Sequence, residues 1–231
     1  MPVVDEIFRE VDDELRAERI RRLARRFAGL GLGIVVLAGA GAGGWEYYRS
    51  TQQARAEQAS LTYFKALHDA GMDESASGAS APLTGVQKKG LASLTQLSGV
   101  APAGLATLSK LRVAAASAAH GDVQSALTTW NSIAADRQAD RNLRDLATLL
   151  WCQWQIDSGD VATVRSRLSL LTDNGKPYAA LANEALATLD IREGQDKSAR
   201  GRLTRLTQDF AAPEGVRMRA NALLQTLGQA G

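Results

Sequence analysis

Three glycines, Gly39, Gly41 and Gly44, are the first residues of the chain whose spacing could support chemistry. They follow an apolar run over residues 34–37, and a Gly-x-Gly-x-x-Gly turn after a buried strand binds the pyrophosphate of a dinucleotide. That fingerprint also needs an acidic residue about 20 residues further on to bind the ribose. The segment found there, residues 61–67 (LTYFKAL), has no acid, and no later segment predicts further parallel strands. A nucleotide-dependent enzyme that uses Gly39–Gly44 is therefore a remote alternative.

The two histidines, His68 and His120, are the imidazoles that could bind a metal or transfer protons. Neither has a second histidine or a cysteine at the spacing of a zinc site. His120 stands just before Gly121, where the last turn of a helix favours a cation or a hydrogen bond to a carbonyl. His68 stands similarly near Gly71. The chain also lacks a Gly-x-Ser-x-Gly nucleophile motif and a Walker phosphate loop. We therefore expect a protein that is not an enzyme and uses no metal or cofactor.

Single polar residues in the C-terminal half predict structure rather than catalysis. Asp190 and Glu193 have the spacing of an exposed helix face, so both carboxylates are expected to be solvated. Cys152 is the only cysteine, which excludes an intramolecular disulfide. It lies between Trp151 and Trp154 and is expected to be a small core residue, since free cysteines are commonly buried.

Two groups of larger side chains offer binding chemistry. Five arginines on the second helices of adjacent units could form a stripe for an acidic partner or for anionic lipid headgroups, although ordinary solubility is the favoured interpretation; they are Arg165, Arg167, Arg200, Arg202 and Arg205. Three tryptophans could anchor a bound peptide in a groove, although we expect them to fill the core; they are Trp130, Trp151 and Trp154.

The composition predicts helices to carry these residues. The chain has 231 residues with 27 Lys+Arg against 25 Asp+Glu, so its balance of charge gives no indication of nucleic-acid binding. Aromatic residues are 5% of the chain, Ala and Leu are abundant, and runs of β-branched residues are almost confined to residues 34–36. Because Ala and Leu are strong helix formers, we predict an all-α protein.

An uncharged segment near the N-terminus predicts a transmembrane helix over residues 27–48. Its core, Phe27 to Trp45, has 19 residues without a charge and as a helix would span roughly 28 Å. Two Gly-xxx-Gly pairs, Gly29/Gly33 and Gly39/Gly43, could form a face for homo- or hetero-association with another membrane helix. Aromatic residues follow at the far end, where they settle at the membrane interface.

The distribution of arginines predicts the orientation of this helix. Five arginines lie between residues 19 and 26, whereas only Arg49 and Arg55 lie close on the other side, so residues 1–26 are expected to stay in the cytoplasm. In a bacterium the C-terminal part would then be periplasmic and the protein would be a single-pass inner-membrane protein. A cleaved signal peptide is the rival interpretation, because Ala38-Gly39-Ala40 is a small-x-small pattern. The long, acidic N-terminal region favours an uncleaved anchor.

Beyond the predicted span, the chain predicts a stalk followed by helical repeats. We expect a charged cytoplasmic helix in 1–26, a helical stalk and a flexible loop in 49–82, and a repeat domain in 83–231. The repeat signal is a glycine at the end of one helix, with an Asp one or two residues later that caps the next. The glycines Gly121, Gly159 and Gly194 are spaced 38 and 35 residues apart. That spacing is near the 34-residue period of tetratricopeptide repeats, and a last helix over 214–228 is expected to cap the stack.

These segments together resemble a known family of bacterial single-span inner-membrane proteins with a periplasmic tetratricopeptide-like domain. The family is described as ancillary SecYEG translocon subunit (YfgM-like) or as cell division coordinator with a TPR domain. The resemblance rests on the charged head IFREVDDELRAERIRRLARRF (7–27), the span, LTYFKAL (61–67), and the repeats at 177–203 and 215–227. It implies a membrane-anchored protein-binding module that associates with translocon subunits and periplasmic chaperones and has no catalytic residues. A periplasmic scaffold for envelope assembly or division is the alternative.

Overall fold

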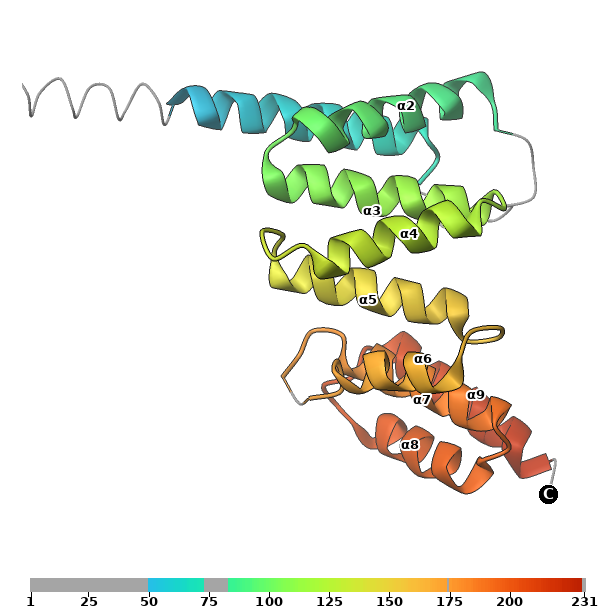
Figure 1. Cartoon of the computed structure of the whole chain (residues 1–231). Helices are drawn as coiled ribbons and strands as arrows, with labels where there is room; N and C mark the ends of the chain where they lie inside the picture. Colours follow the sequence, from blue (N-terminus) through green and yellow to red (C-terminus); the bar gives the residue numbers. More distant parts are fainter. Residues whose placement is uncertain (1–49, 73–82, 174, 230–231) are drawn as a thin grey trace, which may run out of the picture. The chain divides into compact units, whose positions relative to one another are not determined.

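A computed structural model describes residues 50–72, 83–173 and 175–229, and every regular element in these ranges is an α-helix (Figure 1). The all-α prediction is therefore confirmed for the described part of the chain. The chain divides into two compact units, Met1–Glu57 and Gln58–Gly231. Of the first unit the structure describes only residues 50–57, which are helical.

The second unit begins with helical residues 58–69 and continues with eight further helices that follow one another in space as they do along the chain (Figure 1). Consecutive helices pack on each other. In addition, α3 contacts α5, α5 contacts α7, and α7 contacts α9. This alternation is the arrangement of stacked helix pairs. The helices are α2 (Gly85–Val100), α3 (Ala103–Ala119), α4 (Val123–Ala135), α5 (Arg141–Gln155), α6 (Val161–Ser169), α7 (Ala179–Arg192), α8 (Asp196–Gln208) and α9 (Glu214–Gln229).

Two of the three repeated glycines end helices in the predicted way. Gly121 and Gly194 have φ angles of 93° and 69°, a left-handed conformation that glycine adopts without strain. Asp122 and Asp160 cap the next helices as predicted, since their carboxylates accept hydrogen bonds from the amides of Ser125 and Thr163. The recurrence read from the sequence therefore marks real helix boundaries.

Two details of that recurrence are wrong. Gly159 does not have a positive φ; instead, a Cβ at this position would lie 2.6 Å from the Gln155 carbonyl oxygen, so glycine is needed for close packing. Asp196 is not the cap of α8 but its first residue, and Gln195 occupies the cap position without a side-chain hydrogen bond. An acid in the first turn still complements the helix dipole, which explains why the sequence pattern persists when the boundary shifts by one residue.

Capping by Asp160 predicts a pH dependence of stability. Hydrogen bonds from Thr163 hold the pKa of the Asp160 carboxyl below its usual value of 3.8. A carboxyl whose folded pKa is depressed stabilises the fold above its unfolded pKa, and this contribution is lost as the pH falls through the folded pKa. The gap in thermal midpoint between the wild type and Asp160→Ala should therefore be present at pH 7 and shrink at pH 3. A gap that is constant with pH would contradict this account.

Residues 58–70 are an integral part of the second unit. Tyr63, Ala66 and Ala70 are buried against Leu94 and Leu97 of α2 and form one cluster of the core. The predicted helical stalk and flexible loop cover residues 49–82, and residues 58–70 of that segment lie in the same compact unit as the repeats. Residues 73–82 of that segment lie outside the described residues.

The rest of the core runs through the stack as three further clusters. The first joins α3, α4 and α5 around Trp130, the second joins α5, α6 and α7, and the third joins α7, α8 and α9. Because each cluster is shared by successive helices, the apolar face of each repeat is covered by its neighbour. The predicted last helix takes part in this packing through Val216, Ala220 and Leu227 of α9.

The predicted cytoplasmic helix 1–26, the predicted transmembrane helix 27–48 and the glycines Gly39–Gly44 lie outside the described residues. Among the helices that the structure does describe, none combines the length and the hydrophobicity needed to cross a membrane.

Candidate functional site

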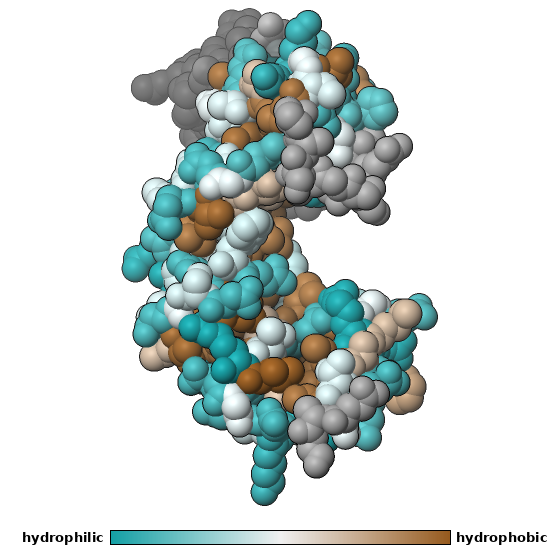
Figure 2. Space-filling model, turned by 90° about the vertical axis from the view of Figure 1, so that its right-hand side faces the viewer, coloured by the Kyte–Doolittle hydropathy of each residue, from teal (hydrophilic) through white to brown (hydrophobic). Residues whose placement is uncertain are grey.

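A groove lies between α5, α7 and α9, the alternate helices of the stack. It has a volume of about 310 Å³ and is lined by Gln153, Ile156, Leu181, Glu184, Ala185, Thr188 and Arg219. The space-filling view in Figure 2 shows apolar and hydrophilic side chains next to each other where the surface of the second unit is hollowed. A surface of this kind, with an apolar floor and a few polar groups, is what a protein-binding site needs.

An ion pair spans the groove from α9 to α7. The Arg219 guanidinium donates from Nε to one carboxylate oxygen of Glu184 at 2.5 Å, and from an Nη atom to the other oxygen at 2.7 Å. This hydrogen-bonded carboxylate raises the pKa of Arg219 above its ordinary value. The side chain of Glu184 is 13% exposed, whereas that of Arg219 is 57% exposed. The surface that solvent meets at this point is therefore the guanidinium and not the carboxylate.

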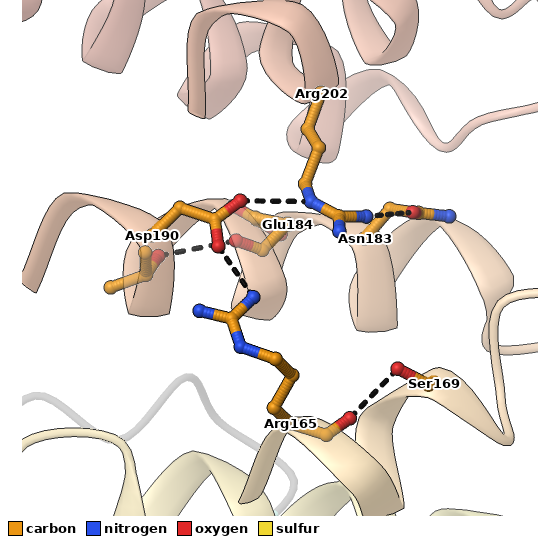
Figure 3. A network of polar contacts seen from close by, with 7 residues as sticks. Arg165, Ser169, Asn183, Glu184, Asp190 and Arg202 are labelled. Carbon is orange, nitrogen blue, oxygen red and sulfur yellow. Dashed lines mark hydrogen bonds and ion pairs between the residues drawn. The ribbon is translucent and has the colours of Figure 1, made fainter. Parts of the chain in front are cut away.

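Asp190 is buried and paired, which corrects the expectation that it is solvated. Its side chain is 1% exposed, and its two oxygens accept hydrogen bonds from Arg165 of α6 at 2.6 Å and from Arg202 of α8 at 2.9 Å (Figure 3). Arg202 also reaches the Asn183 side-chain oxygen at 3.5 Å. Glu193, the C-cap residue of α7, is exposed as predicted. The network therefore joins three consecutive helices through one carboxylate.

The five predicted arginines do not form a free stripe, because four of them make internal contacts. Arg165 and Arg202 bind Asp190, Arg200 donates to the Leu227 carbonyl, and Arg205 is exposed. Arg167 lies 3.9 Å from the centre of the Trp151 ring and also donates to the Asn131 side chain. An arginine over an indole face makes a favourable cation–π contact. The cluster therefore connects helices.

The three tryptophans have different environments. Trp130 is completely buried in the core as expected, and Trp151 is partly buried beneath Arg167. Trp154 is 41% exposed, and its ring centre lies 6.3 Å from that of Trp130. The core prediction is thus confirmed for Trp130, whereas Trp154 covers the core at the surface.

His120 is the C-cap residue of α3. Nδ1 of His120 lies 2.8 Å from the Ala116 carbonyl oxygen at the end of α3, which confirms the predicted capping role. Its ring also lines a second groove between α2 and α3, together with Leu91 and Val113. The described ranges contain no group of three or more histidine, cysteine or acidic side chains that could hold a metal ion.

Cys152 is a buried core thiol, as the sequence predicts. It packs among residues of α5, α6 and α7, and its Sγ lies 3.9 Å from the Val164 carbonyl oxygen. Burial raises the pKa of the thiol from 9.0 to about 12, against a smaller lowering by Arg167. Because the thiolate is the nucleophile, the native protein should react very slowly with Ellman's reagent at pH 8 and rapidly once it is unfolded in urea. Fast native reaction with one equivalent would contradict the buried placement.

Sequence reasoning missed the groove, although the repeat period contains a signal for it. Glu184 and Arg219 are 35 residues apart, which is one repeat. They therefore occupy corresponding positions on α7 and α9, the first helices of two neighbouring helix pairs. Opposite charges at corresponding positions would predict a pair across the stack. This signal is weak, because only these two residues carry it.

Comparison with known proteins adds a family. A model of the tetratricopeptide repeat-like domain matches residues 25–200, which is most of the chain. No curated protein and no solved structure matches the chain. The match agrees with the stacked helix pairs described above, and such domains mediate protein–protein interactions and are typically non-enzymatic scaffolds. The chain belongs to the tetratricopeptide repeat-like domain family and is a protein–protein interaction module of that family.

Proposed function

We propose that the protein is a membrane-anchored interaction module that binds proteins beside the Sec translocon, among them translocon subunits and periplasmic chaperones that handle exported chains. The observation that carries this proposal is the groove between α5, α7 and α9 in a stack of paired helices. The first helices of successive units contact one another, so they form one surface on which a partner can extend over several repeats.

The anchor would be the segment over residues 27–48, whose core Phe27 to Trp45 has no charge, with residues 1–26 in the cytoplasm and the repeats in the periplasm. Tethering raises the effective concentration of a partner held at the same membrane, so a modest affinity is sufficient. The Sec assignment is supported by the resemblance of the head, the span and the repeats to the translocon-associated family. A scaffold for envelope assembly or division has the same architecture, and partner identity separates the two.

Crosslinking in intact membranes tests the function. A photo-crosslinking amino acid replaces Thr188, which lines the groove, in the full chain; the matched control replaces Lys197, which is exposed on α8 outside the groove. Translocon subunits and chaperones should be captured through position 188 and not through position 197. Capture of division or wall-synthesis proteins instead would favour the scaffold, and equal capture at both positions would overturn the groove as the binding surface.

Alkaline extraction of the same membranes tests the anchor separately. A transmembrane helix keeps the full-length chain in the bilayer after a carbonate wash at high pH, because its apolar residues stay in the hydrocarbon region. Release of the full-length chain would end the anchor proposal. A shorter chain in the soluble fraction, starting near residue 41, would support the cleaved signal peptide.

A further inference from the structure

We propose that the groove between α5, α7 and α9 binds an extended polypeptide segment in which a Glu or Asp side chain stands next to a bulky apolar side chain. This inference rests on the proposed protein-binding function and specifies the chemistry of the partner. The acidic residue would bind Arg219 and the apolar residue would cover Ile156, Leu181 and Ala185.

The first argument is the geometry of Arg219. Glu184 accepts from Nε and from one Nη atom, which occupies one edge of the guanidinium. The other edge, formed by the two Nη atoms, keeps its remaining N–H groups, and Arg219 has no other hydrogen bond or ion pair among the described residues. Two parallel N–H groups in a plane match the two oxygens of a carboxylate. Gly215 lies close to this edge, since a Cβ there would be in van der Waals contact with an Nη atom of Arg219 at 3.5 Å.

The second argument is the charge that a partner would meet. The two charges of the pair cancel formally, but the carboxylate is 13% exposed and lies beneath a guanidinium that is 57% exposed. The other polar side chains lining the described groove, Gln153 and Thr188, are neutral. An approaching segment therefore meets a positive group, and a negative side chain complements it.

The third argument is that Glu184 holds Arg219 in place before a partner arrives. A free arginine loses side-chain entropy when it is fixed by a ligand, and that loss weakens binding. Here two hydrogen bonds to a mostly buried carboxylate already fix the plane of the guanidinium. The partner carboxylate can therefore join the pair without breaking it.

The floor of the groove selects the neighbour of the acidic residue. Ile156 and Leu181 are partly buried and leave apolar surface that a bulky side chain would remove from water, and the buried Ala185 lines the groove beside them. The lining comes from three successive first helices, which favours a segment extended along the stack over a compact ligand. Apolar contact would supply affinity, and the carboxylate would supply specificity.

The test uses the purified full chain in mild detergent and an array of decapeptides with blocked ends. One set of peptides has Glu between two residues drawn from Leu, Ile, Phe and Met, and the matched sets have Gln or Lys in place of Glu. Binding to the Glu set should exceed binding to the Gln set by about fivefold, the effect expected of a charge pair at a guanidinium that is 57% exposed. Raising the salt concentration should reduce this preference.

Variants of the full chain locate the effect. Arg219→Gln should abolish the preference for Glu, and Arg219→Lys should restore it only in part because lysine lacks the fork. Arg205→Gln, which removes an exposed arginine of α8 away from the groove, is the matched control and should keep the full preference. Circular dichroism checks that each variant is folded, and Arg219→Lys keeps a positive charge beside the Glu184 carboxylate, which is 13% exposed.

Three outcomes would overturn the inference. They are equal binding of the Glu and Gln sets, stronger binding of the Lys set, and loss of the preference in Arg205→Gln. Absence of binding to all sets while the full chain still crosslinks to its partners through position 188 would also reject this partner chemistry and leave the proposed function standing. Absence of both binding and crosslinking would reject the two together.

Discussion

Replacement of Asp190 by alanine is expected to lower the free energy of unfolding by about 3–5 kcal/mol, the cost of removing one partner from a buried ion pair. The carboxylate is 1% exposed and binds Arg165 and Arg202, so its loss leaves two guanidinium groups facing each other without a counter-charge. The two arginine side chains are 30% and 28% exposed and can turn partly toward water. Because the arginines can be partly solvated in this way, we expect a loss in the free energy of unfolding toward the lower end of that range.

Urea unfolding followed by circular dichroism measures this effect. Glu193→Ala is the matched control, because it removes an exposed carboxylate from the C-cap of the same helix and should change stability by no more than about 0.5 kcal/mol. A loss below about 1 kcal/mol in Asp190→Ala would show that the network contributes little.

A triple variant tests whether the unbalanced charge of the two arginines is the reason why Asp190→Ala loses stability. Asp190→Leu combined with Arg165→Met and Arg202→Met removes all three charges and keeps side chains of similar size. Because apolar replacement of a complete buried ion network is often neutral or stabilising, the triple variant should recover most of the stability that Asp190→Ala loses. If it is as unstable as Asp190→Ala, the carboxylate acts through its shape and its position on α7 and not through its charge.

The burial of Asp190 shows where sequence reasoning stops. In the sequence, Asp190 and Glu193 look alike, since both are acids at helical spacing. Their difference depends on Arg202, 12 residues away, and on Arg165, 25 residues away, which approach Asp190 only when α6 and α8 pack on α7. Local periodicity carries no information about that approach.

The helix boundaries are easier to predict from the sequence, because residues close together in the chain determine them. Gly121 and Asp122 end one helix and cap the next within a few residues, so composition and spacing predict them. Gly159 fits the same pattern for another reason, its close contact with Gln155, which requires coordinates. The candidate groove lies between these cases, since the repeat period relates Glu184 to Arg219 but does not predict that the pair lies beside an apolar floor.

Replacement of Gly90 by valine is the second large effect expected. Gly90 is buried in α2 where that helix crosses residues 66–70, and a Cβ there would lie 2.5 Å from the Ala70 nitrogen and 2.8 Å from the Ala66 oxygen. Both contacts are with backbone, which cannot turn aside as a flexible side chain can. The helices must separate, which opens the core around Tyr63 and Leu94. We expect a loss of about 3 kcal/mol or more, at or beyond the upper end of ordinary overpacking.

The damage should be confined to one end of the stack. Each pair of helices contacts only the neighbouring pairs of the stack. Separation of residues 58–70 from α2 should therefore leave α7, α8 and α9 intact. Hydrogen exchange measured by mass spectrometry should therefore show lost protection in residues 58–70 and in α2, with native protection in α7 to α9. Uniform loss along the chain would mean that the second unit unfolds as a single cooperative body.

Gly99→Ala is the control for Gly90→Val. Gly99 lies in the same helix, but a Cβ there would meet no atom within 4 Å. Alanine favours the helix over glycine by about 1 kcal/mol in a helix interior and by less near the helix end, so this variant should be as stable as the wild type or slightly more stable. Opposite signs at two glycines of one helix would show that Gly90 is required by the close approach of two backbones and not by flexibility. If Gly90→Val were as stable as Gly99→Ala, residues 58–70 would not pack on α2 as the structure describes.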